Sequence, residues 1–127
     1  MSFENHKGQF QNYLENEKNR LIQKSQQLKS ECRDDEYKFL QVELNIVDIF
    51  TKMFVISCQK AASAQNWQIA LSETYLSFFE KIPMAWQENL KKCTEYGLDD
   101  EVMIESLKLQ RAETIKSMFI TMLSESV

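Results

Sequence analysis

The sequence predicts an all-α protein, an antiparallel up-down-up-down four-helix bundle. The chain holds only 2 Gly and 1 Pro among 127 residues, apolar residues recur at helical spacing, and the helical segments have similar lengths. Because β-rich folds need many turns, and turns use Gly and Pro, this composition favours a few long helices with short links. With 43% hydrophobic and 27% charged residues, the chain is typical of one globular domain, which we assign to residues 1–127.

The first two helices are expected over residues 3–32 and 35–64. The first has polar residues on most of its surface and one narrow apolar stripe, formed by Phe3, Phe10, Leu14, Leu21, Leu28 and Cys32. Gly8 is expected to let the first turns of this helix fray. The Asp34–Asp35 pair is expected to end one helix and start the next. The main apolar face of the second consists of Leu40, Leu44, Val47, Phe50, Phe54, Cys58 and Ala61. Together with a second apolar line, it makes this helix apolar over most of its circumference, which predicts a central helix or one with a neighbour outside the bundle.

The third arm is expected to be kinked or broken at Pro83, giving segments 67–82 and 83–96. Asn66 is the predicted N-cap, and Gly97 is expected to adopt the left-handed conformation that ends the arm. A last helix is expected over residues 100–124, capped by Asp99. At about 1.5 Å per residue, each arm is about 40 Å long, and arms of matched length with short links predict the antiparallel bundle.

Two charged residues fall on apolar helix faces. At 100° per residue, Glu43 lies between Leu40 and Val47, and Arg111 lies on the apolar side of the last helix. In the predicted topology these two helices run parallel on a diagonal, and the two residues lie at similar depth. We therefore predict a buried or half-buried Glu43–Arg111 ion pair, because an isolated buried charge is unfavourable. The alternative is that each side chain reaches the bundle surface along its flexible stem.

Apolar residues also recur outside the main faces. The second helix carries such residues at a spacing of seven, and the last helix carries a similar line. They predict a surface for a protein partner or for a homodimer, unless these helices are more enclosed than a simple bundle allows. The candidate residues are Val42, Ile49, Ile56, Val102, Leu109 and Ile120.

Several chemistries are disfavoured by residue types and spacing. The three cysteines show no metal-binding spacing, and the single histidine, His6, lies near the expected frayed end without an ExxH motif, so we predict no metal, no cofactor and no catalytic residues. Cys58 and Cys93 lie on apolar stripes and are interpreted as fillers. A net charge of −4 without a basic stripe argues against nucleic acid and membrane as partners.

The sequence thus favours a non-enzymatic, acidic protein that works by protein–protein interaction, as an adaptor, regulator or chaperone. Free thiols and the absence of an apolar signal segment favour the cytoplasm. The alternative function is binding of an apolar small molecule in the bundle core, near Trp67 or Trp86. An enzyme built on carboxylates, Lys, Tyr or Cys is a third hypothesis, which a strongly raised pKa of Glu43 would support.

Overall fold

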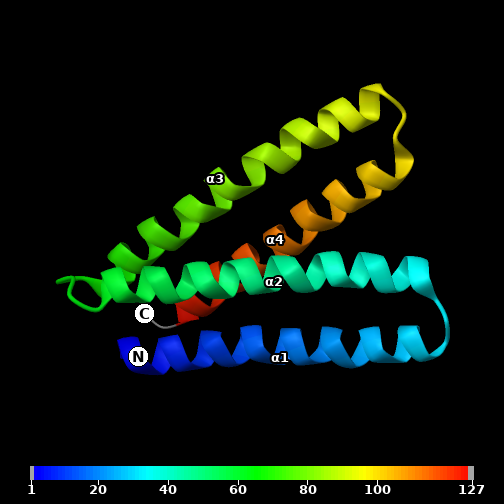
Figure 1. Ribbon diagram of the computed structural model, residues 1–127. Helices are drawn as coiled ribbons and strands as arrows, with labels where there is room; N and C mark the ends of the chain where they lie inside the picture. The colour runs from blue at the N-terminus through cyan, green and yellow to red at the C-terminus, as the bar shows by residue number, and fades with distance from the viewer. Residues whose placement is uncertain (1, 126–127) are drawn as a thin grey trace.

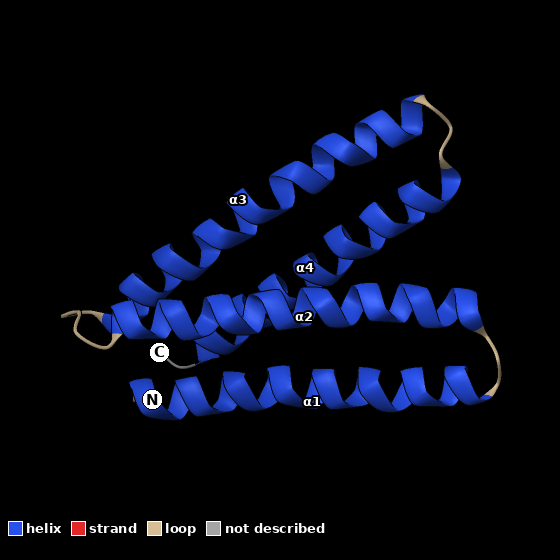
Figure 2. Cartoon of the chain, in the orientation of Figure 1, coloured by secondary structure: helices blue, strands red, loops and turns tan. Residues whose placement is uncertain are grey.

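The computed structural model describes residues 2–125, which form four helices. These are α1 (Phe3–Ser30), α2 (Asp34–Ala61), α3 (Trp67–Glu95) and α4 (Asp99–Glu125). Successive helices run in opposite directions, so that α1 begins and α4 ends at the same end of the molecule (Figure 1). Only short links join the helices, and the described residues contain no strand (Figure 2). The predicted all-α, up-down-up-down bundle is therefore confirmed.

The bundle is splayed rather than uniform. α1 and α2 form one hairpin and α3 and α4 form another, and the two hairpins diverge towards their tight turns (Figure 1). α2 packs against all three other helices, including α4 across the diagonal, whereas α1 meets α4 over a much shorter stretch. α2 is thus the central helix, as its broad apolar face predicts.

The core is built around aromatic rings from every helix. Phe10, Phe54, Tyr75 and Phe119 come from α1, α2, α3 and α4 in turn, and all four are fully buried. Ring centroids lie 4.8 Å apart for Phe10 and Phe54, and 4.8 Å apart for Tyr75 and Phe119. Most contacts in this cluster are tilted or edge-to-face, the geometry that aromatic quadrupoles favour. These aromatic side chains therefore fill the middle of the bundle.

The third arm is one continuous helix with Pro83 inside it, so of the two predicted alternatives, a kink or a break, the break at Pro83 is excluded. Proline has no N–H, so the carbonyl of Phe79 loses its usual helical donor. Both Phe79 and Pro83 are buried, and the Phe79 ring stacks on Phe50 with centroids 4.1 Å apart. Burial of Pro83 and of Phe79 one turn before it therefore offsets the missing hydrogen bond within a continuous helix.

Both hairpin turns contain a residue in the left-handed conformation. Gly97 has φ +69°, and the N–H of Leu98 donates to the carbonyl of Cys93 at 3.0 Å, as expected for the predicted helix stop. The other turn does the same with a non-glycine residue: Cys32 has φ +59°, and the N–H of Arg33 donates to the carbonyl of Leu28 at 3.0 Å. Cys32 is exposed outside α1, so its placement on the buried stripe is corrected.

Two helix starts are set by side-chain caps. Asn66 accepts a hydrogen bond from the N–H of Ile69 at 3.2 Å, which confirms the predicted cap of α3. Ser2 accepts from the N–H of Asn5 at 3.2 Å, and α1 begins at Phe3 with Gly8 inside it. His6 and Phe10 in the first turns of α1 are buried, which together with the cap argues against the expected fraying. None of the four described helices has a stretch long and apolar enough to cross a membrane.

Candidate functional site

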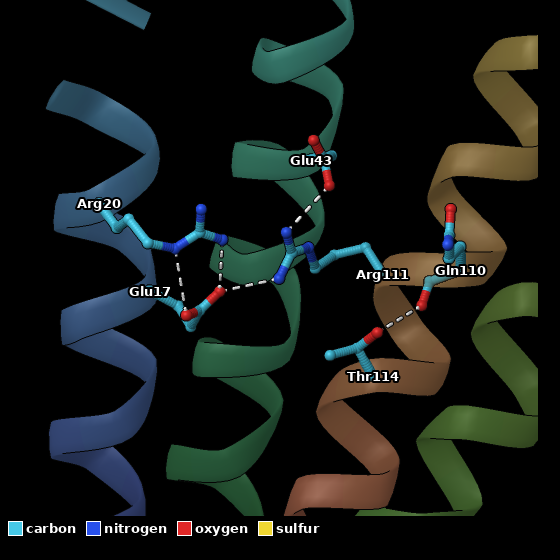
Figure 3. Close-up of polar contacts among 6 residues, drawn as sticks. All are labelled: Glu17, Arg20, Glu43, Gln110, Arg111 and Thr114. Carbon is cyan, nitrogen blue, oxygen red and sulfur yellow. Dashed lines mark hydrogen bonds and ion pairs between the residues drawn. The ribbon is translucent and has the colours of Figure 1, made fainter. Parts of the chain in front are cut away.

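A cluster of four charged side chains ties α4 to α1 and α2. Arg111 on α4 reaches towards the other hairpin, with Nη2 2.9 Å from Oε1 of Glu43 and Nη1 2.9 Å from Oε2 of Glu17 (Figure 3). The Arg111 side chain is 11% exposed and each carboxylate about a fifth exposed, so the cluster is half-buried. The structure thus brings together Glu43 and Arg111, the pair that the sequence placed at similar depth.

Glu17 and Arg20 complete the cluster, and sequence reasoning missed both. Nη2 of Arg20 lies 3.0 Å from Oε2 of Glu17, so that one carboxylate serves two guanidinium groups. The hydrogen bond from Arg20 is the main reason why the pKa of Glu17 is lowered, with burial acting in the opposite direction. The signal was present: Glu17 lies seven residues after Phe10 and four before Leu21, on the apolar stripe itself.

The cluster occupies an open groove of about 430 Å³. Tyr13 on α1 and the α4 residues Gln110 and Thr114 also line it (Figure 3 shows the last two), and Thr114 Oγ1 donates to the carbonyl of Gln110 at 3.0 Å. Burial and the neighbouring Glu17 carboxylate raise the pKa of Tyr13. The tyrosine stays protonated and Glu17 stays ionised near neutral pH, so neither group is tuned for proton transfer there. The arrangement suits an electrostatic cross-link between three helices.

A second groove, mostly apolar, runs between α3 and α4 on the outside of the bundle. We call it the α3/α4 groove; its volume is about 600 Å³, and its apolar lining residues are Ile69, Leu76, Phe119, Ile120 and Leu123. Two of these are large and open to solvent, since Ile69 is 55% and Ile120 46% exposed. A smaller depression of about 190 Å³ continues along the same two helices and is lined by Phe79, Pro83, Leu109 and Ala112, among others.

The six residues of the predicted partner surface are divided between two places. Leu109 and Ile120 line the two depressions between α3 and α4, and α2 contributes no residue to either one. The side of α4 that faces α2 is instead the side that carries Arg111. On α2, Ile56 is 39% exposed. The remaining three residues are half-buried: Val42, Ile49 and Val102. The α4 line therefore borders α3 rather than joining the α2 line in one groove.

His6 is part of the core, which corrects its expected place at a frayed end. The side chain is fully buried, and neither ring nitrogen has a hydrogen-bond partner in the part of the chain that the structure describes. Its ring centroid lies 5.4 Å from that of Trp67 and 6.1 Å from that of Phe119. Burial lowers the pKa of His6, because a charged imidazolium would have no compensating group in this apolar setting. The stripe indicated this position, since His6 lies four residues before Phe10.

The cysteines differ in their surroundings. Cys58 is buried, and burial raises the pKa of its thiol to about 11, so the nucleophilic thiolate is disfavoured at neutral pH. Cys93 is buried too, and its thiol donates to Oε2 of Glu101 at 3.2 Å. Within residues 2–125, no group of three or more His, Cys, Asp or Glu side chains is placed to hold a metal ion.

The fold and these sites define a splayed, all-α four-helix bundle with a half-buried ionic cross-link between three helices and an apolar groove between α3 and α4. No family model matches the chain, and neither a curated protein nor a solved structure shows significant similarity to it.

Proposed function

We propose that this protein acts by binding another protein through the α3/α4 groove, without catalysing a reaction. The observation that carries the proposal is the pairing of Ile69 and Ile120, two exposed isoleucines from different helices at one apolar groove. Single exposed apolar residues are common on protein surfaces, but an apolar groove with exposed walls is typical of an interaction site. The role is that of an adaptor, regulator or chaperone in the cytoplasm, a location that suits three free thiols.

The state of the polar groups supports a non-enzymatic role. Glu17 and Glu43 are engaged by Arg111, and the Cys58 thiol is held protonated by burial. An enzyme of the acid–base type needs a group whose pKa lies near the working pH, in reach of a substrate. The pKa values of Glu17 and Tyr13 are shifted away from neutrality rather than towards it. Stabilisation of the fold is a sufficient role for this cluster.

The predicted alternative was a small apolar ligand in the core. Aromatic rings fill the centre of the bundle, and Phe54 and Tyr75 lie only 5.2 Å apart between their centroids. The α3/α4 groove, in contrast, is open along its length and suits an extended partner better than an enclosed ligand. We therefore place binding on the surface.

Site-specific photo-cross-linking tests the proposal. A photoreactive phenylalanine analogue is placed singly at position 69, 120 or 56 in the full chain, and cross-linked proteins from native cells are identified by mass spectrometry. We expect positions 69 and 120 to capture the same protein, and position 56, on the exposed face of α2, not to capture it. Ile120→Asp should abolish the cross-link from position 69.

Two results would count against the groove. If position 56 captures a protein that positions 69 and 120 do not, the binding surface lies on α2 instead. If all three positions yield only the background of an unmodified sample, the protein does not act through this groove. Circular dichroism of each variant establishes that the fold is intact before cross-linking.

A further inference from the structure

The length and shape of the α3/α4 groove suit a helix as its occupant. The groove and the depression beyond it follow two antiparallel helices from Ile69 to Pro83 on α3. Fourteen helical steps of about 1.5 Å correspond to about 21 Å, or roughly four turns of a docked helix. An apolar groove between two helices is the usual seat of an amphipathic helix, whose anchors recur at spacings of three, four and seven. A third helix laid there would cover Ile69 and Ile120 together.

The charged residues along the groove are mainly acidic. Glu73 lines the α3/α4 groove, Glu113 lines the depression beyond it, and Glu80 lies seven residues after Glu73 on the same face of α3. All three side chains are exposed, and none has an ion-pair partner among the described residues. Among residues 2–125, Lys116 is the one basic residue that lines the two depressions. This rim therefore has a net negative charge.

Exposed acidic residues elsewhere, such as Glu15, Glu88 and Asp100, also have no ion-pair partner among the described residues, so the rim is distinguished by its place beside an apolar groove. Other acidic residues are paired. Glu17 and Glu43 pair with Arg111, Asp48 pairs with Lys52 at 3.0 Å, and Glu105 pairs with Lys108 at 2.9 Å. A row of carboxylates left without partners beside an apolar groove favours a partner of opposite charge, because complementary potentials steer association and set its register. A second copy of this chain is disfavoured by the same reasoning, since it also has a net charge of −4 and the same acidic rim.

We propose that the α3/α4 groove binds an amphipathic helix with an apolar face and a basic flank, whose Lys or Arg side chains pair with Glu73, Glu80 and Glu113. This inference rests on the proposed function and names the chemistry of the partner. The apolar face of that helix covers Ile69, Leu76 and Ile120, and its basic flank lies along the rim. Apolar contact supplies most of the affinity, while the charges discriminate between partners.

Fluorescence anisotropy with two designed peptides tests this proposal on the full chain. Both are helix-stabilised fluorescein-labelled peptides of about four turns with the same leucine face, one flanked by Lys and the other by Glu. We expect the Lys-flanked peptide to bind at least about tenfold more tightly at low salt, with the difference shrinking in molar salt as the charges are screened. A Glu73→Lys, Glu113→Lys double variant should reverse the preference. Ile69→Asp with Ile120→Asp should abolish binding of both peptides, and Ile56→Asp should change neither.

Each contrary result has a separate meaning. Equal binding of both peptides, lost in the double isoleucine variant, overturns the basic flank but leaves the groove as a binding site. Binding of neither peptide, with cross-links at positions 69 and 120 still present, overturns the helical occupant while the proposed function stands. If both the peptides and the cross-links fail, the proposed function fails as well. Self-association of the wild type by sedimentation equilibrium, lost in Ile120→Asp, would make a second copy the occupant and overturn the proposal.

Discussion

Arg111 and Glu17 are 94 positions apart in the chain, yet Nη1 of the arginine lies 2.9 Å from Oε2 of the glutamate. This contact joins α4 to α1, two helices that otherwise meet over a short stretch. Since the same guanidinium also holds Glu43 on α2, one side chain links both helices of the first hairpin to the second. Because this contact helps to hold the two hairpins together, its removal should lower the free energy of unfolding.

Arg111→Met should lower the free energy of unfolding by about 2–3 kcal/mol, slightly less than for a fully buried pair, because it leaves two half-buried carboxylates without their shared cation. Glu43→Gln should have a smaller effect, since Arg111 keeps Glu17. Urea denaturation at neutral pH measures both. Lys52→Met is the matched control, as it breaks the exposed Lys52–Asp48 pair and should change stability by less than about 0.5 kcal/mol. Equal, small effects from all three variants would mean that the Arg111 cluster does not stabilise the fold.

His6 should make the protein less stable in mild acid. Its pKa is lowered from the usual 6.5 in the folded state by burial, so the unfolded chain takes up a proton more readily. The stability present above pH 6.5 therefore falls as the pH drops towards the folded-state pKa, at a rate of at most about 1.4 kcal/mol per pH unit. Urea denaturation between pH 8 and about pH 5 avoids the range in which carboxylates titrate.

His6→Leu is the test variant, because leucine fits an apolar site and does not titrate. We expect His6→Leu to flatten the dependence of stability on pH in this range. At pH 8 its free energy of unfolding should match or exceed that of the wild type, because the variant buries no unpartnered ring nitrogens. If the wild-type slope persists in His6→Leu, another group is responsible for the acid sensitivity.

The two hairpin turns should respond in opposite ways to the loss or gain of a Cβ atom. Cys32→Gly should stabilise the protein by about 1 kcal/mol, because φ +59° is unfavourable for a non-glycine residue, and Gly97→Ala should destabilise it by about 1 kcal/mol. A Cβ at Gly97 would meet no atom within 4 Å, so the loss comes from backbone conformation alone. Gly8→Ala is the control for the substitution itself: within α1 and also free of clashes, it should stabilise by about 0.5–1 kcal/mol. Thermal unfolding distinguishes the three, and a stabilising Gly97→Ala would contradict this account.

A single hydroxyl group joins α3 to α2 inside the core. The Tyr75 hydroxyl donates to the carbonyl oxygen of Phe50 at 2.9 Å, and burial raises the pKa of Tyr75 well above its usual 10, which keeps the donor protonated. Tyr75→Phe keeps the ring and should lower the free energy of unfolding by about 1 kcal/mol. Tyr96→Phe removes a hydroxyl from a side chain that is 77% exposed, and should have no measurable effect by urea denaturation. Indistinguishable results for the two variants would show that the hydrogen bond makes no net contribution.

The fold class, the approximate helix ends and two of the four residues of the ionic cluster were predictable from the amino-acid sequence alone. Helical periodicity is local, and so are the Asn66 cap and the Gly97 stop, because each depends on residues within a turn or two of one another. The Glu43–Arg111 contact could be predicted for a similar reason. The matched helix lengths indicate the depth of each residue along the bundle, and both residues lie on apolar helix faces.

Tertiary structure decided what periodicity cannot address, which is the neighbour that each helix face meets. The continuity of α3 through Pro83 depends on packing at Phe79, and the burial of His6 depends on Trp67 and Phe119 from other helices. The α3/α4 groove arises because the line through Ile120 borders α3 instead of α2. A helical wheel gives the angle of a side chain about its own axis, but the rotation of that axis against its neighbours results from the packing of the whole core.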